Sequence, residues 1–466
     1  MSYTGVSDRQ ASTGSQTKKD TANRPYIPPK YMPAHVRLPK TGLVNFGNTC
    51  YMNSVLQALS ATVPLSVFLM DDAYRAQLQR DNWKSSRGIL TELYANLIRS
   101  LWKGDVSAIR PTTFRNFIKR TSETFNNEDQ QDAKEFLELM VDVLHEDGNR
   151  MWARSPLREL TEKEEEKREQ MPKSVVARTE WGRYTHRDLS FVQGLFAGQH
   201  ASRLTCATCG FTSTTYEAFW SISVEIPTNS RFWSGGGGRM PTLDDCLRSY
   251  FAEERLTKDD QYRCPRCKTF REAIKRLTLT RAPQFLVVHF KRFESKSSSS
   301  SSSSFFPTPS SSSSSSSLRK IRQPVDFPLT NLSLDPYFLP PPSAAEEKSI
   351  LASYGPQALA PDPAMQGPFS YDAYAVIRHL GGTMQSGHYV TAARKGGGSS
   401  SSAGGKGAGM NGGGAGAGGT TTGNKEWMWF NDTNVTEFVP SEVPGTGGRE
   451  RDLRGEEAYI VFYQRV

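Results

Sequence analysis

The order of apolar and polar residues predicts a helical first half and a β-rich second half. Between Tyr51 and Leu101 apolar residues recur at helical spacing, and Asp129–Leu144 repeats that spacing. From about Phe191 short runs rich in β-branched and aromatic residues take over, which is typical of strands. Because helices come first and strands follow, the sequence predicts an α+β fold. The expected strands are Thr212–Tyr216, Trp220–Ile226, Ala273–Leu279, Phe285–Phe290, Tyr374–Arg378, His388–Ala392 and Ala458–Tyr463.

Segments of biased composition precede and interrupt this pattern. Residues 1–40 form a polar, basic leader with several prolines near its end, which we expect to be disordered. Serine runs (295–318) and a Gly/Ser/Ala tract (395–424) interrupt the second half, and Ser234–Gly238 is a shorter insert. Such composition cannot offset its ordering entropy by burial, so we interpret the inserts as surface loops. The charged stretch Glu159–Glu169 predicts a solvated helix or a linker.

The composition argues against a membrane-spanning, a secreted or a disulfide-rich protein. The 466 residues contain no apolar run of about 18, and no apolar stretch near the N-terminus resembles a secretory signal. We therefore expect no membrane partner, and a location in the cytoplasm, the nucleus or both. In a reducing compartment six cysteines indicate metal binding or catalysis rather than disulfides. The net charge is +9, and nucleic acid is an expected partner only if the basic leader contacts it.

One cysteine has the surroundings of a nucleophile. Residues 42–57 read GLVNFGNTCYMNSVLQ, so Cys50 lies between a Gly/Asn-rich turn and a helical apolar pattern. A helix N-terminus favours the thiolate form of cysteine. Position alone is also compatible with an ordinary small buried residue. The side-chain amide of Asn45, in the same turn, is a candidate donor for an oxyanion hole.

A thiolate needs a general base and a group that orients the base. His388, in SGHYVTA, follows Gly387 and begins an expected strand, which would hold the imidazole at a fixed angle. Asn431 and Asp432 follow an aromatic strand, and either one could accept a hydrogen bond from the imidazole. The order Cys, His, Asn/Asp with wide separations is that of papain-like proteases.

Four of the remaining cysteines form two C-x2-C pairs. The pairs are CATC, with Cys206 and Cys209, and CPRC, with Cys264 and Cys267. Four thiolates suit one tetrahedral, structural Zn²⁺ site with no open position for water. The spacing between the pairs exceeds that of a usual zinc ribbon. Cys246 lies on an apolar helical pattern, and we interpret it as a core residue.

Several long motifs together resemble the ubiquitin-specific protease family. GLVNFGNTCYMNSVLQAL resembles its cysteine box, and YAVIRHLGGTMQSGHYV with WMWFNDTNV and AYIVFYQRV resembles its histidine box. QQDAKEFLELMVDVL at 130–144, LVVHFKRF at 286–293 and VDFP at 325–328 are similar to further family landmarks. The resemblance extends from about residue 41 to residue 466, with the motifs in the family's order.

The resemblance implies a papain-like fold and a set of roles. Cys50 would be the nucleophile, His388 the base and Asn431 the orienting residue, with Asp432 sharing that role and Asn45 in the oxyanion hole. The implied subdomains are a thumb (about 41–190), zinc-containing fingers (about 191–280) and a palm (about 281–466). The two C-x2-C pairs would meet at the tips of the fingers, around one zinc per chain. No organic cofactor is expected.

The resemblance also implies a substrate, ubiquitin joined to other proteins. Ubiquitin ends in Leu-Arg-Leu-Arg-Gly-Gly, so its site needs carboxylates for the arginines and a narrow slot for the glycines. Asp132 and Glu135 match acidic positions that hold this tail in similar enzymes, and their i, i+3 spacing places both on one helix face. Without the resemblance, two solvated acids would be the simpler interpretation.

Three other functions compete with deubiquitination by a thiol protease. A catalytically silent ubiquitin-binding scaffold is disfavoured, because Cys50, His388 and Asn431 are all present. A protease for another ubiquitin-like modifier stays open, because such tails also end in Gly-Gly. Zinc-dependent nucleic-acid binding would need more basic and aromatic residues around the cysteine pairs than Arg263, Arg266, Lys268 and Arg271 provide. The chain-linkage preference and the protein targets do not follow from the sequence.

Overall fold

The computed structural model describes residues 38–228, 239–294, 319–384, 386–395, 427–441 and 452–466. The leader (1–40) and the two inserts (295–318 and 395–424) fall almost wholly outside these residues, and the short insert Ser234–Gly238 falls entirely outside them. The expectations about the leader and the inserts therefore stay predictions.

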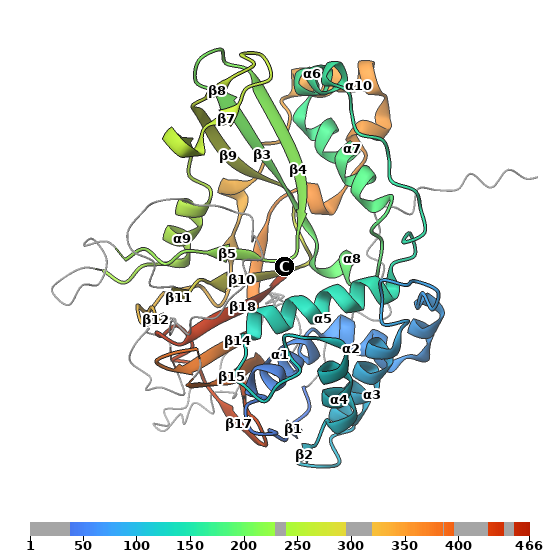
Figure 1. The fold of residues 1–466 in the computed structure, drawn as a ribbon, viewed down its shortest axis with the longest axis vertical. Helices are drawn as coiled ribbons and strands as arrows, with labels where there is room; N and C mark the ends of the chain where they lie inside the picture. The colour runs from blue at the N-terminus through green and yellow to red at the C-terminus, as the bar shows by residue number, and fades with distance from the viewer. Residues whose placement is uncertain (1–37, 229–238, 295–318, 385, 396–426, 442–451) are drawn as a thin grey trace, which may run out of the picture.

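The first part of the chain is helical, as expected. Helices α1 (Cys50–Ser60), α2 (Val63–Met70) and α3 (Ile89–Lys103) account for the predicted helical pattern, with a 3-10 turn between α2 and α3. Helices α4 (Thr112–Thr121) and α5 (Ala133–Gly148) complete the group, which fills the lower right of Figure 1. Among the described residues no single helix meets the length and hydropathy needed to cross a membrane, whereas α1 and α2 meet them jointly across an 86° bend.

A large sheet of eight strands forms the second part of the fold. Its strand order is β17-β16-β15-β14-β18-β10-β5, with β13 paired to β14, and only the β10–β5 pair is parallel. The bounds are β5 Ile222–Val224, β10 Phe285–Phe290, β13 Leu332–Ser333, β14 Ser370–Gly381, β15 Gly387–Arg394, β16 Trp427–Asn431, β17 Asn434–Phe438 and β18 Ala458–Arg465.

The large sheet is buried on both faces. In β10, Phe285 and Val287 point into one core with the helices, whereas Leu286 and Val288 point into a second core. Successive side chains of a strand point to opposite faces, so a run such as FLVVHF is apolar throughout because both faces are covered. Helix α9 (Leu243–Tyr250) contributes to the second core, where Cys246 is fully buried, which confirms its interpretation as a core cysteine.

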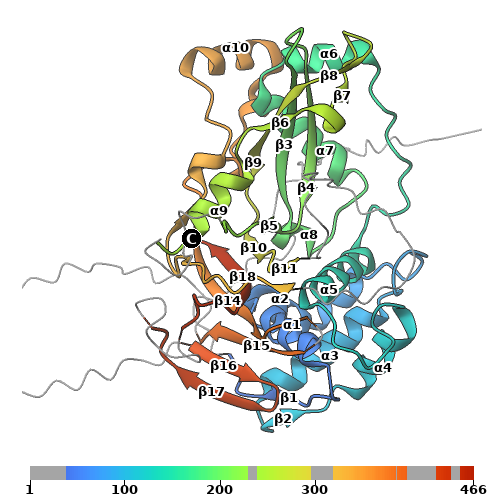
Figure 2. The same cartoon turned by 60° about the vertical axis from the view of Figure 1, so that its left-hand side comes forward.

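A second, four-stranded sheet rises from the large one. Its order is β4-β3-β9-β6, with bounds β3 Gly198–Cys206, β4 Thr212–Phe219, β6 Glu254–Leu256 and β9 Ala273–Arg281. Helices α6 (Glu162–Gln170), α7 (Lys173–Thr185) and α10 (Ala344–Tyr354) lie beside it, at the top of Figures 1 and 2. A hairpin of β7 (Tyr262–Arg263) and β8 (Phe270–Arg271) stands at its far end.

The architecture confirms the α+β expectation, with differences at element boundaries. Helix α5 begins at Ala133 instead of Asp129, because the side chain of Asp132 accepts a hydrogen bond from the Lys134 N–H and so caps the helix. Strand β5 is shorter than the expected Trp220–Ile226. The charged stretch forms α6, which has no buried residue and is thus a solvated helix.

Candidate active site

Cys50 is the first residue of α1 and lies in a rigid turn. The Asn45 side-chain oxygen accepts hydrogen bonds from the N–H groups of Gly47 (2.9 Å) and Thr49 (3.0 Å) and from the Thr49 hydroxyl (3.1 Å). Gly47 has φ +119°, a conformation that L side chains rarely adopt. The turn therefore fixes Cys50 at the N-terminus of α1, where helix N–H groups stabilise negative charge.

His388 lies on β15, directly against the helix that begins with Cys50. Helix α1 packs on β15, and the Thr391 hydroxyl of that strand donates a hydrogen bond of 2.8 Å to the Ser54 carbonyl oxygen. A hydrogen bond with Cys50 raises the pKa of His388 to about 9, against an opposing effect of burial and with a further contribution from Asn431. An imidazole with this pKa is protonated at neutral pH, as a thiolate–imidazolium pair requires.

Asn431 is the residue that orients His388. It ends β16, and its side-chain oxygen accepts a hydrogen bond of 2.7 Å from Nε2 of His388. With Nε2 used in this way, Nδ1 is the ring nitrogen left for Cys50. Of the two candidates left open by the sequence, Asn431 therefore makes the direct hydrogen bond.

Asp432 has a different position and joins the large sheet to the helical part. Its Oδ2 atom lies 3.8 Å from Nε2 of His388, beyond hydrogen-bond distance. The same carboxylate accepts hydrogen bonds from the side-chain amides of Asn45 (2.9 Å) and Asn53 (2.7 Å). Its backbone oxygen accepts from the Leu43 N–H at 2.9 Å. Asp432 therefore acts on His388 through its charge and holds Asn45 in place.

Asn45 keeps one amide hydrogen available. Its Nδ2 donates one hydrogen bond to Asp432, and an amide nitrogen has two hydrogens. The side-chain oxygen is fully used inside the turn, which fixes the orientation of the amide. A donor held in this way fits the expected oxyanion role.

Gln130 belongs to the site although the sequence did not single it out. The Cys50 thiol lies 3.8 Å from the Gln130 side-chain oxygen, within the distance of a weak sulfur hydrogen bond. The Gln130 amide donates to the Asn48 side-chain oxygen (3.2 Å) and to the Gly387 carbonyl oxygen (3.0 Å). Gln130 therefore connects the Cys50 turn to the residue before His388. The only sequence signal for it is its place in the QQDAKEF motif.

Glycine is the only residue type that fits at position 387, directly before His388. A Cβ atom at this position would lie 2.0 Å from Nε2 of His379, whose side chain is fully buried. The His379 ring packs edge-on against Phe293 and Tyr389 and has no room to move away. The absence of a side chain at Gly387 therefore allows the close approach of the His379 ring.

The two acidic residues proposed for substrate binding differ in their surroundings. The Asp132 carboxylate caps α5 and accepts a hydrogen bond from the Tyr459 hydroxyl at 2.7–2.8 Å. Glu135 is exposed on the first turn of the same helix. Burial raises the pKa of the Asp132 carboxyl group, and in Glu135, whose carboxylate is partly shielded although the residue is exposed, partial burial and the charge of Asp132 raise the pKa. Glu135 is therefore the carboxylate that is free to meet a basic ligand.

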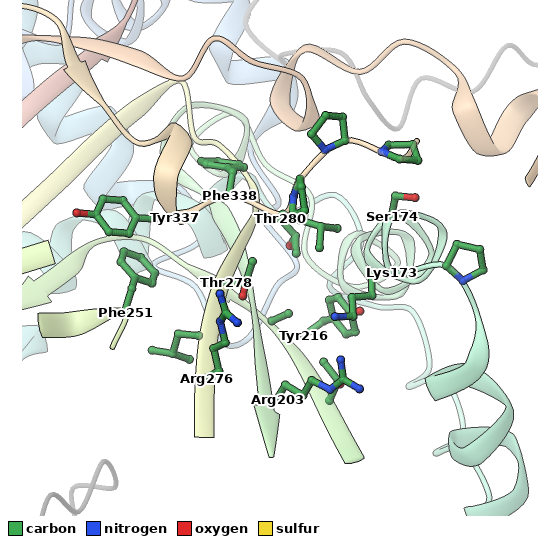
Figure 3. A pocket seen from close by; sticks show the side chains of 18 of the residues that line it. Lys173, Ser174, Arg203, Tyr216, Phe251, Arg276, Thr278, Thr280, Tyr337 and Phe338 are labelled. Atoms are coloured by element: carbon green, nitrogen blue, oxygen red, sulfur yellow. The ribbon is translucent and has the colours of Figure 1, made fainter. Parts of the chain in front are cut away.

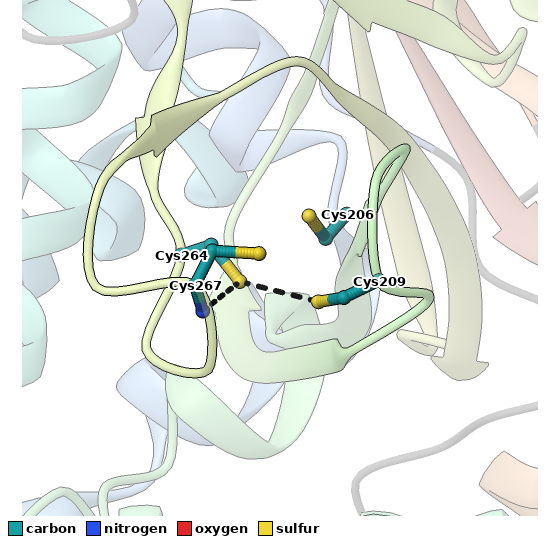
Figure 4. Close-up of side chains that lie close together, drawn as sticks. All are labelled: Cys206, Cys209, Cys264 and Cys267. Carbon is teal, nitrogen blue, oxygen red and sulfur yellow. Dashed lines mark hydrogen bonds between the residues drawn. The ribbon is translucent and has the colours of Figure 1, made fainter.

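The two cysteine pairs come together at the far end of the four-stranded sheet. The pair Cys206–Cys209 lies at the β3–β4 turn and Cys264–Cys267 at the β7–β8 turn, and the four sulfur atoms lie within 4.8 Å of one another (Figure 4). The Cys209 and Cys264 sulfurs are 3.6 Å apart. A tetrahedral metal with bonds of about 2.3 Å separates its sulfur ligands by about 3.8 Å, so the cluster can hold a metal.

Comparison with known proteins identifies relatives along nearly the whole chain. The family model described as ubiquitin carboxyl-terminal hydrolase matches residues 41–463. The chain is 30% identical over 437 residues to ubiquitin carboxyl-terminal hydrolase 4 of Saccharomyces cerevisiae, covering 91% of this chain and 39% of that protein. It is 30% identical over 424 residues to human ubiquitin carboxyl-terminal hydrolase 2, covering 91% and 54%. The chain thus spans about two fifths to half of these relatives.

Solved structures show the same fold. The SAGA Ubp8/Sgf11/Sus1/Sgf73 deubiquitinating module bound to ubiquitin aldehyde contains a chain that matches 93% of this one and is matched over 71% of its own length. The TM-score is 0.56 and the sequence identity 18%. A second structure of that module, with a variant of Ubp8 and bound to monoubiquitin, matches with a TM-score of 0.55 at 18% identity.

Proposed function

Since the chain belongs to the ubiquitin carboxyl-terminal hydrolase family, we propose that it is a cysteine-type deubiquitinase. It hydrolyses the isopeptide or peptide bond after the C-terminal glycine of ubiquitin. The observation that supports this most directly is the arrangement of Cys50, His388 and Asn431. The His388 Nε2 atom donates a hydrogen bond of 2.7 Å to the Asn431 side-chain oxygen. The hydrogen bond with Cys50 raises the pKa of the imidazole to about 9.

The reaction proceeds through an acyl-enzyme. The Cys50 thiolate attacks the carbonyl carbon of the terminal glycine, and the remaining amide hydrogen of Asn45 donates to the developing oxyanion. The His388 imidazolium then donates its proton to the leaving amine, and a thioester remains on Cys50. In the second half, neutral His388 takes a proton from water, which attacks the thioester and releases ubiquitin.

Asn431 and Asp432 divide the orienting role between them in this proposal. Asn431 fixes the ring plane and directs Nδ1 of His388 toward Cys50. Asp432 lies 3.8 Å from Nε2, so its charge favours the imidazolium without a direct hydrogen bond. It also holds Asn45, which couples the oxyanion donor to the base.

Ubiquitin is the proposed partner, and its basic C-terminal tail is the part that approaches Cys50. We propose that Glu135 contacts an arginine of the tail, because its carboxylate is exposed beside the site. Asp132, which caps α5 and binds Tyr459, adds negative charge and holds the helix in place.

The cysteine cluster holds Zn²⁺ in this proposal. Cys206, Cys209, Cys264 and Cys267 supply four thiolates, the preferred ligands of structural zinc, and no organic cofactor is needed. The metal joins the β3–β4 turn to the β7–β8 hairpin at the tips of the proposed fingers. We keep the subdomain bounds proposed from sequence: thumb about 41–190, fingers about 191–280 and palm about 281–466. A cluster of thiolates and a free Cys50 fit a reducing compartment, so we propose the cytosol or the nucleus.

The decisive experiment uses ubiquitin that carries a C-terminal electrophile. The wild-type chain should form a covalent adduct, the Cys50→Ala variant should form none, and Cys246→Ala should react like wild type. If wild type forms no adduct but binds ubiquitin, the chain is a silent scaffold. Equal labelling by a probe built on another ubiquitin-like modifier would contradict ubiquitin as the specific substrate.

A further inference from the structure

A cavity of about 940 Å³ lies on one face of the four-stranded sheet. Strands β3, β4 and β9 form its floor, while the start of α7 and the segment 336–350 form its walls (Figure 3). None of the proposed catalytic, ubiquitin-binding or metal-binding residues lines it. Its volume is within the range of small-molecule sites, about 300–1,000 Å³.

Three cations converge on the floor and wall of this cavity. Arg203 on β3 and Arg276 on β9 are direct partners in the antiparallel register, so two like charges stand opposite each other. Like charges in this position destabilise a sheet. Lys173, at the start of α7, faces both in Figure 3. Burial lowers the pKa of Lys173, and the charges of Arg203 and Arg276 lower it further, against an opposing effect of Glu169.

The protein balances the charges of the cavity only in part: Arg248 pairs with Asp244 at 2.7 Å between exposed side chains, which leaves Lys173, Arg203 and Arg276 as the cations of interest. The cavity lining contains four cationic side chains (Lys173, Arg203, Arg248 and Arg276) and two acidic ones (Glu253 and Glu346).

The two carboxylates of the lining neutralise the remaining cations only weakly. Glu346 is used by the capping box of α10, and the Arg276–Glu253 pair is 3.8 Å long between two well-exposed side chains. Within the described part of the chain no carboxylate forms an ion pair with Lys173 or Arg203. The Nε atom of Arg203 is buried without a hydrogen-bond partner.

The wall of the cavity adds a second kind of anion-binding group. Helix α7 has 13 residues, and its N-cap, Pro172, offers no side-chain hydrogen bond to the first turn. Pro172, Lys173 and Ser174 all line the cavity. The N–H groups at a helix start attract anions, and together with arginines they are the usual ligands of phosphate. The hydroxyls of Thr205 and Thr278 line the floor and add further donors.

We propose that this cavity binds a small, multiply phosphorylated molecule, with Arg203, Arg276 and Lys173 contacting its phosphate groups. A compact polyanion fits better than an acidic peptide, because the cations are gathered at one place instead of following an extended groove. Binding would relieve the repulsion between the two arginines and so stabilise the sheet that bears the cysteine cluster. This inference does not depend on deubiquitinating activity.

Calorimetric titration of the full chain with inositol hexakisphosphate tests the proposal. We expect one molecule bound per chain, and weaker binding as salt rises from about 50 mM to 500 mM. The double variant Arg203→Gln/Arg276→Gln should lose about tenfold or more in affinity. Arg255→Gln is the matched control, because Arg255 is an exposed arginine of the same sheet outside the cavity, and it should bind like wild type.

Three results would overturn the proposal. These are no binding by wild type, equal binding by the double variant, and binding of a phosphoserine peptide where inositol hexakisphosphate does not bind. Thermal unfolding of the unliganded variants distinguishes a lost site from a lost fold. The double variant should unfold at the wild-type temperature or above it, since like-charge repulsion is removed, whereas only wild type and Arg255→Gln should gain stability from the ligand.

Discussion

The Gln130 side-chain amide donates a hydrogen bond of 3.0 Å to the carbonyl oxygen of Gly387. This contact joins the segment before α5 to the residue that precedes His388, and the Gln130 oxygen lies 3.8 Å from the Cys50 sulfur. Cys50 and His388 thus lie on separate parts of the fold, and one glutamine side chain contacts both parts.

We expect Gln130→Ala to lower kcat more than it raises KM. The variant loses the bonds to Asn48 and Gly387, and two such bonds correspond to about tenfold to a hundredfold in kcat/KM. Gln131→Ala is the matched control, because among the described residues the Gln131 side chain has one hydrogen bond, to the exposed Asn127, and it should retain wild-type kinetics. Steady-state hydrolysis of a fluorogenic ubiquitin derivative measures both constants. Equal kinetics for the two variants would contradict the positioning role.

The pKa of His388 should depend on Cys50. It is raised from 6.5 to about 9, with the hydrogen bond to Cys50 as the largest cause, so Cys50→Ala should return it well toward 6.5. The folded site holds this proton more tightly than the unfolded chain, so the associated stabilisation is complete below about pH 6.5. It is lost as the pH rises through about 9. NMR titration of the histidine ring protons gives the values, with Cys246→Ala as control. An unchanged value in Cys50→Ala would refute the pairing.

Gly387→Ala should destabilise the protein. The added Cβ would lie 2.0 Å from the buried His379 ring, and overpacking of this kind costs about 1–3 kcal/mol. Gly182→Ala provides the contrast, because Gly182 is an exposed residue of α7 with open space around it. That change should raise the free energy of unfolding by up to about 1 kcal/mol. Urea unfolding compares the two, and equal stability of Gly387→Ala and wild type would contradict the close packing.

Metal analysis should find about one zinc per chain, since one four-cysteine cluster is present among the described residues. Cys264→Ser should lose most of the metal, whereas Cys246→Ala should keep it, although each removes one cysteine. A chelator should lower the thermal unfolding temperature of wild type and leave that of Cys264→Ser unchanged. Zinc-free wild-type protein, purified without chelator, would exclude the assignment.

We expect Asp132 to contribute to the stability of the protein and Glu135 to contribute to ubiquitin binding. Asp132→Ala loses a helix cap and leaves the Tyr459 hydroxyl without its acceptor, so it should lower the free energy of unfolding by about 1–3 kcal/mol. Glu135→Gln should leave stability unchanged and raise KM for a ubiquitin substrate about threefold to tenfold at low salt. Unfolding and steady-state assays on both variants check this division, and the reverse pattern would contradict it.

Much of the fold was predictable because its signals are local. Apolar spacing identified the helices around Leu93 and Phe136, and β-branched runs such as FLVVHF identified the strands of the large sheet. The two C-x2-C pairs indicated a cluster that the structure assembles. Order and surroundings pointed to Cys50, His388 and the Asn431–Asp432 pair, the family resemblance singled out Asn431, and the structure places Asn431 in a hydrogen bond with His388.

Other features depend on long-range contacts that a local pattern does not contain. Strand β3 was not predicted, because its sequence, GQHASRLTC, is polar and lacks the alternation typical of a strand. Most of its later residues are only partly buried, so its position in the sheet does not require apolar side chains. Helix α5 was expected from Asp129, but it begins at Ala133, and the Asp132 cap is held by a hydrogen bond from Tyr459, far along the chain. Gln130 was overlooked because its partners lie at Asn48 and Gly387, far along the chain.

The hydrogen bond between Asn45 and Asp432 determines when the turn that bears Cys50 can reach its final form during translation. It joins residues 387 positions apart, and the bond from Asn53 to the same carboxylate joins residues 379 apart. A ribosome must therefore translate past residue 432 before the turn that bears Cys50 acquires its partners. Until then the nascent chain contains Cys50 without the side chains that position it, so the proposed site cannot form before residue 432 has been made.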